Sequence, residues 1–399
     1  MKITGLQLIR HTVSFEPAYP HGDRNVGPLD VYEEYAADLR RAAVRGPGGY
    51  HDGQLSGAFL AIETDDGVEG VHGPIAYRSQ LLAAVDGLAG HLIGRDPLEN
   101  RLIWDVLSRF DRHSRAGVML MAISTVDIAL WDLKGKILGQ PVYKLLGGGR
   151  GAVRPYISAL GFPVEPKAAA ETACRLKADG APAQKWFFRY GPSAGAEGMR
   201  KNLDMAFAVR EALGEDYGLA FDCWMGWSMP YAREMLRRLE PVRPMWVEEV
   251  LRPHMLEGYR HLRQETQVPL SAGEHLYTRM EVKPFLEEGI FAVMESDPEW
   301  CGGITEALRI GDLCELYQTT FIPHGHALMP ALHVVATMPP DISPYCEVLI
   351  HSIDGKTAFF RDKRIGPDGI LYLNDTPGLG EELDMERILH SEKITAFTL

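Results

Sequence analysis

The chain of 399 residues has few cysteines, no excess of positive charge and no long apolar run. Its five cysteines are scattered, odd in number and free of any Cys-x-x-Cys pair, which argues against a disulfide framework and a thiolate zinc site. The formal net charge of −13 argues against nucleic acid or an anionic membrane as the main partner. We therefore expect a protein of a reducing compartment, the cytoplasm.

No segment suits membrane insertion or export. The longest apolar stretch, residues 117–131, is interrupted by Asp127 and is too short to span a bilayer. Residues 1–13 carry charges at Lys2 and Arg10 and lack an apolar core followed by a small-residue cleavage site, so we expect no signal peptide. With 46% hydrophobic residues, the chain can instead bury a large core.

The N-terminal part has the pattern of a mixed α+β region. Residues 1–13 alternate enough for a strand, and residues 57–63 and 68–72 flank an Asp-Asp-Gly turn, which predicts a hairpin. Residues 17–56, rich in Gly and Pro, predict a long loop with one short helix, and long loops often act as lids or binding loops. Helical patterns follow over residues 78–92, 97–110 and 118–138.

From about residue 154, strands and helices alternate strictly. Helical stretches, such as 166–178 and 198–213, lie between most of the strands. Eight apolar strands joined by helices predict a parallel sheet closed as a barrel. The tail from about residue 357 is polar with Gly and Pro, and we expect it to pack on the N-terminal region. The predicted strands are 154–160, 184–188, 218–223, 245–250, 269–274, 291–297, 320–324 and 345–349.

Three acidic residues end three successive predicted strands: Asp222, Glu248 and Glu274, spaced 26 and 26 residues apart. Barrel enzymes build their active sites at this end of the strands. A single acid there is often a helix cap or a solvated loop residue, but three in register suggest oxygen ligands for Mg²⁺, which would relieve their mutual repulsion. Glu249 is an alternative to Glu248, but strand alternation and the spacing favour Glu248.

The next two strands end in Asp297 and in His324-Gly-His326. A carboxylate beside an imidazole fixes its tautomer and raises its pKa, which makes a competent general base. A histidine in such a place is often only structural, yet its position after three candidate ligands makes His324 the leading base. His326 could instead bind a metal together with His324, although the neighbouring candidate ligands are all oxygen atoms.

Further polar residues could bind a substrate carboxylate or move a proton. Lys185 and Arg189 share one parity on an early strand, so that Arg189 lies at or beyond the rim; they could neutralise a carboxylate, or could simply be solvated. Glu347, on the last strand, could donate a hydrogen bond to a developing oxyanion if it is protonated, and is otherwise a buried partner of another residue. His275, directly after Glu274, is a further acid or binding candidate.

The residues resemble the mandelate racemase/muconate lactonizing enzyme branch of the enolase superfamily. The motifs are MAISTVDIALWDLKGK at 121–136 and PVYKLLGG at 141–148, together with the strand-end acids and the Asp297–His324 pair. Within that branch, the sequence is most similar to the L-rhamnonate dehydratase family. The stretches that carry this similarity are 191–203, 221–225, 273–275, 300–306 and 323–325.

The resemblance implies an α+β capping domain at 1–125, a (β/α)7β barrel at 126–356 and a C-terminal segment at 357–399 that packs on the cap. It also implies one essential Mg²⁺, a carboxylate substrate and assembly as a homo-oligomer. The implied reaction removes the proton α to the carboxylate of an acid sugar and eliminates the 3-hydroxyl, giving a 2-keto-3-deoxy acid. His324 would be the base, Lys185 and Glu347 would assist at the carboxylate, and His324 or His275 would supply the acid.

Three positions depart from the pattern of many relatives. Phe187 replaces the second lysine of Lys-x-Lys, Trp224 replaces the asparagine of Asp-x-Asn, and Val250 replaces the proline of Glu-Glu-Pro. Losing the second lysine removes a base on one face of the substrate, which disfavours racemisation and leaves dehydration possible. Epimerisation or cycloisomerisation at the same site, and a non-catalytic barrel subunit, are the alternatives.

The identity of the acid sugar depends on residues around the barrel mouth and on the capping loop. At the mouth, the candidates for contact are Trp224 and Trp300, beside Arg189. The loop candidates are His21, Arg24, Arg45 and His51.

Overall fold

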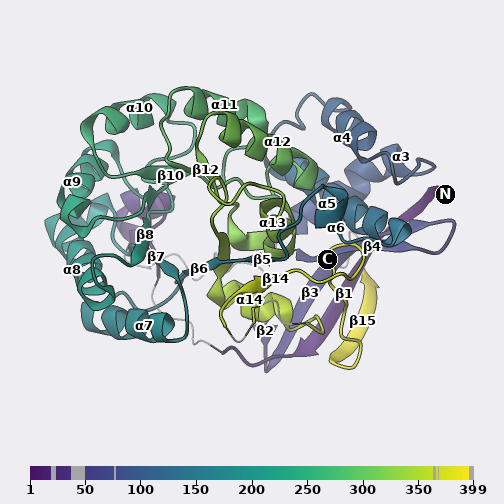
Figure 1. Cartoon of the computed structure of the whole chain (residues 1–399), viewed down its shortest axis with the longest axis horizontal. Helices are drawn as coiled ribbons and strands as arrows, with labels where there is room; N and C mark the ends of the chain where they lie inside the picture. The colour runs from purple at the N-terminus through teal and green to yellow at the C-terminus, as the bar shows by residue number, and fades with distance from the viewer. Residues whose placement is uncertain (19–23, 37–49, 76–77, 363–364, 367, 395–399) are drawn as a thin grey trace.

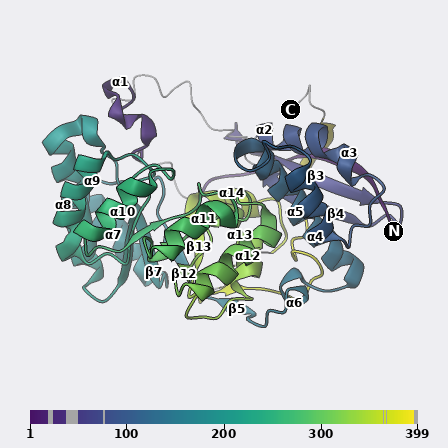
Figure 2. The same ribbon diagram turned by 90° about the horizontal axis from the view of Figure 1, so that it is seen from above.

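The structure, a computed structural model, describes residues 1–18, 24–36, 50–75, 78–362, 365–366 and 368–394. A barrel of parallel strands surrounded by helices lies beside a second region, which we call the cap: an antiparallel sheet with the helices of residues 78–138 (Figure 1). Seen from above, the cap lies at one end of the molecule and the helices of the first half of the barrel lie at the other (Figure 2).

The cap sheet joins the two ends of the chain. Its strands are β1 (Ile3–Ser14), β2 (Tyr50–His51), β3 (Gln54–Thr64), β4 (Glu69–Ile75) and β15 (Ile388–Ile394). Their order is β15-β1-β3-β2, with β4 paired to β3. The predicted hairpin turns at Gly67, whose φ of 79° suits glycine. Because β15 pairs antiparallel with β1, the expectation that the tail packs on the N-terminal region is confirmed.

The predicted cap helices are present. They are α2 (Arg78–Leu82), the π-helical segment η3 (Ala83–Leu88), α3 (Ala89–Leu92), α4 (Asn100–Arg109) and α5 (Gly117–Leu138). Helix α5 packs against both β4 of the cap and α12 of the barrel, and its residues are buried on nearly every face. This helix therefore runs through the predicted domain boundary at residues 125/126 and joins the two regions.

The barrel has eight parallel strands in the order β12-β11-β10-β9-β8-β7-β6-β13, so that the last strand lies beside the first. The strands are β6 (Pro155–Ser158), β7 (Ala183–Phe187), β8 (Gly218–Asp222), β9 (Val247–Glu248), β10 (Leu270–Ala272), β11 (Val293–Met294), β12 (Thr320–Phe321) and β13 (Cys346–Leu349). Between β12 and β13, Ser343 donates from its Oγ to the carbonyl of Phe321 at 2.6 Å. The predicted (β/α)7β barrel is confirmed.

Seven helices connect these strands, and an eighth follows the last. They are α7 (Pro166–Ala178), α8 (Gly195–Leu213), α9 (Met229–Leu239), α10 (Leu256–Glu265), α11 (Thr278–Glu287), α12 (Gly303–Leu316), α13 (Leu328–Val335) and α14 (Ile350–Thr357). The inner faces of α7 to α12 pack with β7 to β12 in one apolar cluster, and α13 packs with β6 and β13 in another. No helix in the described part of the chain combines the length and apolarity needed to cross a bilayer.

Shorter elements complete the fold. They are η1 (Pro28–Val31), α1 (Glu33–Ala36), α6 (Val142–Leu145), β5 (Ala152–Val153), η4 (Pro192–Ala194), η5 (Glu240–Val242), η6 (Gly325–Ala327) and β14 (Leu371–Tyr372). Of the predicted loop at 17–56, residues 19–23 and 37–49 lie outside the described residues, and the short helical turns η1 and α1 follow the first of these gaps.

A buried carboxyl fixes the joint between cap and barrel. Asp127 of α5 accepts hydrogen bonds from the backbone N–H and the hydroxyl of Thr305, in the first turn of α12, at 2.9 and 2.6 Å. Burial raises the pKa of Asp127 to about 7, although the bonds from Thr305 oppose this shift. A carboxyl whose pKa is higher in the folded state binds more protons there, so its contribution to stability declines as pH rises from about 4 to about 7.

We therefore expect Asp127→Asn to flatten the decline in unfolding free energy between these pH values. The slope that Asp127 adds in the wild type is at most about 1.4 kcal/mol per pH unit. Urea unfolding of both proteins across this window measures the difference. Parallel pH profiles for the two proteins would show that Asp127 titrates alike in both states.

Candidate active site

A buried lysine stands among three carboxylates inside the barrel. The Nζ of Lys185, on β7, lies 2.5 Å from Oε2 of Glu248, 2.8 Å from Oε1 of Glu347 and 3.4 Å from Oδ2 of Asp222. Strand register brings them together, because Asp222 of β8 is the direct neighbour of Glu248 of β9. Burial would lower the pKa of Lys185, but Glu248 and Glu347 raise it well above its usual value. The lysine is therefore the charge that balances this cluster.

His324, just after β12, bridges two other carboxylates. Its Nδ1 lies 2.7 Å from Oδ2 of Asp297 and its Nε2 lies 2.8 Å from Oε2 of Glu274. Burial would lower the pKa of His324, but Glu274, Glu347 and the hydrogen bond with Asp297 raise it well above its usual value. Asp297 is completely buried and fixes the ring through Nδ1, so that Nε2 is the nitrogen turned toward Glu274.

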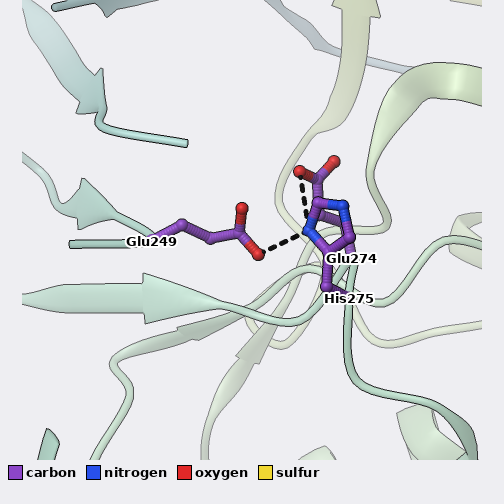
Figure 3. A group of neighbouring side chains, drawn as sticks. All are labelled: Glu249, Glu274 and His275. Carbon is purple, nitrogen blue, oxygen red and sulfur yellow. Dashed lines mark hydrogen bonds and ion pairs between the residues drawn. The ribbon is translucent and has the colours of Figure 1, made fainter. Parts of the chain in front are cut away.

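A second imidazole holds the other side of Glu274. The Nδ1 of His275 lies 3.2 Å from Oε1 of Glu274 and 2.8 Å from Oε1 of Glu249 (Figure 3). Burial would lower the pKa of His275, but Glu274 and Glu249 raise it to about 9. His275 is therefore a cation between two carboxylates in this arrangement.

Some of these groups line a cavity of about 330 Å³, a size in the range of small-molecule sites. The predicted residues that line it are Asp222, Trp224, Glu274, His275, Trp300 and His324; Asn25, Leu160, Phe187, His326 and Leu349 complete the wall. The Trp300 ring is the common surface of the three imidazoles, with centroids 5.7 Å from His275, 5.1 Å from His324 and 5.0 Å from His326.

Several predicted contacts lie elsewhere. Arg189 is beyond the rim and donates to the carbonyl of Arg24, because β7 ends at Phe187 and the chain turns away there. The Arg24 guanidinium forms an ion pair with Asp30. Neither arginine lines the cavity. His21, Arg45 and the side chain of His51 lie outside the described residues.

Lys185 and Glu347 lie below the cavity floor and do not line it. Both are fully buried, and the backbone N–H of Gly325 donates to Oε2 of Glu347 at 2.8 Å. Burial would raise the pKa of Glu347, but Lys185 and His324 lower it. Glu347 is thus an ionised partner of Lys185, the second of its two predicted roles, and not a protonated donor. Lys185 acts on the carboxylates of the protein, at a distance from the space for a substrate.

The backbone turns sharply where two of these strands end. Trp224 and Met225, after β8, and Glu249, after β9, have φ values of 38°, 59° and 44°, which non-glycine residues seldom adopt. The turn at Glu249 sends its side chain to His275 while that of Glu248 enters the barrel. Glu248 therefore belongs to the cluster around Lys185, whereas Glu249 belongs to the cluster of Glu274 and His275.

The oxygen set fits a hard divalent cation. Burial raises the pKa of Asp222 to about 6. Burial, together with the charges of Asp222 and Glu295, raises the pKa of Glu248 well above its usual value. The positive charge near these two carboxyl groups is therefore too small to offset their burial. The buried Oε1 of Glu248 has no hydrogen-bond partner among the described residues. As placed, Lys185 engages Asp222 and Glu248, whereas the two imidazoles engage Glu274. Within the described residues, the group whose ligand atoms lie within 4.8 Å of one another is Glu249, Glu274 and His275.

The sequence contained a signal for one further residue. Glu299 stands two positions after Asp297, as His326 stands two positions after His324. In the structure the Nδ1 of His326 lies 2.5 Å from Oε2 of Glu299, so the two spacings form two histidine–carboxylate pairs. Comparing the two strand ends position by position would have predicted the second pair.

Known families account for both regions. Residues 167–387 match "Enolase C-terminal domain-like", and residues 52–147 match "Mandelate racemase / muconate lactonizing enzyme, N-terminal domain". The chain belongs to the mandelate racemase/muconate lactonizing enzyme family of the enolase superfamily. Membership confirms the resemblance that the sequence motifs indicated.

Relatives within this enolase superfamily branch are named as acid-sugar dehydratases. A D-galactonate dehydratase from Variovorax paradoxus is 34% identical over 84% of the chain and 91% of its own length. An L-rhamnonate dehydratase from Saccharopolyspora erythraea is 30% identical over 91% and 90%. The crystal structure of L-rhamnonate dehydratase from Gibberella zeae superposes with a TM-score of 0.82 at 25% identity, over 97% of this chain and 94% of that one. Another structure of the Gibberella enzyme, with a TM-score of 0.77, is described as complexed with Mg.

Proposed function

We propose that the protein is a Mg²⁺-dependent dehydratase of an acid sugar, which removes the proton α to the carboxylate, eliminates the 3-hydroxyl and yields a 2-keto-3-deoxy acid. The observation that supports this most directly is the imidazole of His324, held by Asp297 through one nitrogen and lining the cavity beside Glu274. A His or Lys base with Mg²⁺ is the known arrangement of enolase-type sites.

Asp222, Glu248 and Glu274 would hold the ion, which when bound supplies Lewis-acid stabilisation of an enediolate. Lys185 holds Asp222 and Glu248 in place from below and lowers the pKa of each, which offsets part of the effect of burial, and Glu347 balances the lysine charge. In the structure, Glu274 contacts Nε2 of His324. When Glu274 turns instead toward Asp222 and Glu248, Nε2 of His324 becomes the basic atom that faces a substrate.

The wall of the cavity favours dehydration over racemisation. Phe187 lines it at the position where many relatives carry a second lysine, so this position offers no base. Racemisation needs proton exchange on both faces of the α-carbon, whereas elimination needs one base and one acid. L-rhamnonate and D-galactonate, after which these relatives are named, are the first candidate substrates to test. The five free cysteines fit a cytoplasmic enzyme.

A screen of aldonates and aldarates for 2-keto-acid formation tests this proposal. We expect turnover of at least one six-carbon aldonate, loss of turnover to background after treatment with EDTA, and recovery on addition of Mg²⁺ but not of Ca²⁺, which prefers more ligands and longer distances. Equal turnover by the metal-stripped protein would contradict the metal dependence. Deuterium exchange at C2 without keto acid from any compound would point to an epimerase instead.

A further inference from the structure

We propose that His326, held by Glu299, is a second catalytic residue, the acid that protonates the departing 3-hydroxyl. This inference rests on the proposed dehydratase function and deepens it. His326 lines the cavity, and its side chain is 15% exposed. Its Nδ1 lies 2.5 Å from a carboxylate oxygen of Glu299, and Nε2 is the nitrogen on the opposite edge of the ring.

The two histidine–carboxylate pairs are nearly copies of each other. The rings of His324 and His326 are inclined by only 8°, with centroids 6.4 Å apart, and both lie against Trp300. A hydrogen on C2 and an oxygen on C3 of one substrate are neighbours, and each needs a nitrogen within about 3 Å. Two parallel imidazoles at this separation can therefore serve the two reacting positions from one face.

Glu299 is built into the protein as a positioning residue. It is completely buried on the segment after β11, and charged or polar side chains approach it from three other elements. Lys356 of α14 lies 3.7 Å from its Oε2, and His72 of β4 in the cap lies 3.9 Å from its Oε1. Lys356 also donates to the backbone carbonyl of His326. The loop that carries His326 is thereby fixed at its side chain by Glu299 and at its backbone by Lys356.

The charges of this cluster suit an acid that must lose and regain a proton. Burial would raise the pKa of Glu299, but Lys356 and His326 lower it, so the carboxylate stays ionised. Burial lowers the pKa of His72 to about 4, so this ring is neutral near pH 7. An ionised Glu299 accepts a hydrogen bond from Nδ1 of His326 and so fixes this nitrogen as a donor.

The proton balance closes over one turnover. Nε2 of His324 takes the proton from C2, and the electron pair of that C–H bond enters the enediolate. The C3–O bond then breaks with its electron pair on oxygen, and that oxygen takes the Nε2 proton of the His326 imidazolium and leaves as water. The enol product gains a proton at C3 from His324, and its hydroxyl proton returns to His326 through solvent, so both imidazoles are restored.

The test follows the two half-steps separately in His326→Asn, in D₂O, with the substrate found for the wild type. Keto-acid formation is expected to fall about 100-fold or more, the usual contribution of one acid catalyst. Deuterium incorporation at C2 of the recovered substrate is expected to persist or rise, because His324 and Asp297 are intact. Glu299→Gln, which keeps an acceptor for His326 but loses the charge, should lower kcat less and leave KM unchanged, with the same shift toward exchange.

His261→Asn, the same change at an exposed histidine of α10, serves as the matched control and should act as the wild type. Wild-type keto-acid formation by His326→Asn would overturn the inference, and so would a parallel loss of exchange and elimination, since that would indicate a structural role. Failure of the proposed function itself is distinct, because the wild-type protein would then form no keto acid from any acid sugar.

Discussion

Replacing His324 by asparagine is expected to abolish both proton exchange at C2 and keto-acid formation, with kcat reduced by about 10⁴. His324 is the imidazole whose position between Asp297 and Glu274 provides a base at the cavity. Asparagine has a similar shape near the backbone and can still donate to Asp297, but it cannot accept a proton in this pH range. Substrate binding should change little, so the loss should appear in kcat more than in KM.

Comparing His324→Asn with His326→Asn distinguishes the roles of the two histidines. Loss of His324 should remove exchange and elimination together, whereas loss of His326 should remove elimination alone. Nuclear magnetic resonance of the substrate in D₂O follows both reactions in one sample. Turnover of His324→Asn at a rate near that of the wild type would remove His324 from the role of base, and a circular dichroism spectrum like that of the wild type would exclude misfolding as the cause of a loss.

The strand ends were the part of the site most open to prediction. Positions 222, 248, 274, 297 and 324 recur at intervals of one strand–helix unit, and a barrel brings all such positions to one mouth. The side-chain partners at that mouth were less predictable. Which carboxylate meets which cation depends on backbone angles after the strands, and a φ of 44° at Glu249 separates it from Glu248 in a way that strand alternation alone does not specify.

The same reason explains the outcomes for the positive side chains. Parity put Lys185 and Arg189 on one face of their strand but left open which face points inward. In the structure Lys185 lies inside the barrel, where it contacts Glu248 and Glu347 of two other strands. Arg189 follows the end of β7, beyond the reach of strand periodicity, and it binds the carbonyl of Arg24 instead of facing the cavity. Long-range contacts of this kind, such as Glu299 with His72, require the fold before they can be seen.

Replacing Lys185 by methionine is expected to lower the free energy of unfolding by about 3–5 kcal/mol, the usual consequence of leaving buried charges without their partner. Methionine fills a similar length, so little of the loss would come from a cavity. What remains is the cluster of Asp222, Glu248 and Glu347 around an uncharged side chain. Urea unfolding of the metal-free protein measures the effect.

Magnesium should restore part of this loss, and more of it in Lys185→Met than in the wild type, because a ligand that binds only the folded state stabilises it and the variant's carboxylates have no competing cation. Lys167→Met is the matched control: Lys167 is 83% exposed and pairs with Glu171 along α7, so its removal should change the free energy of unfolding by no more than about 1 kcal/mol, with the same response to Mg²⁺ as the wild type. Equal stability of the two variants would mean that the carboxylates of the barrel do not depend on Lys185 for their charge balance, and the described arrangement of the cluster would then be wrong.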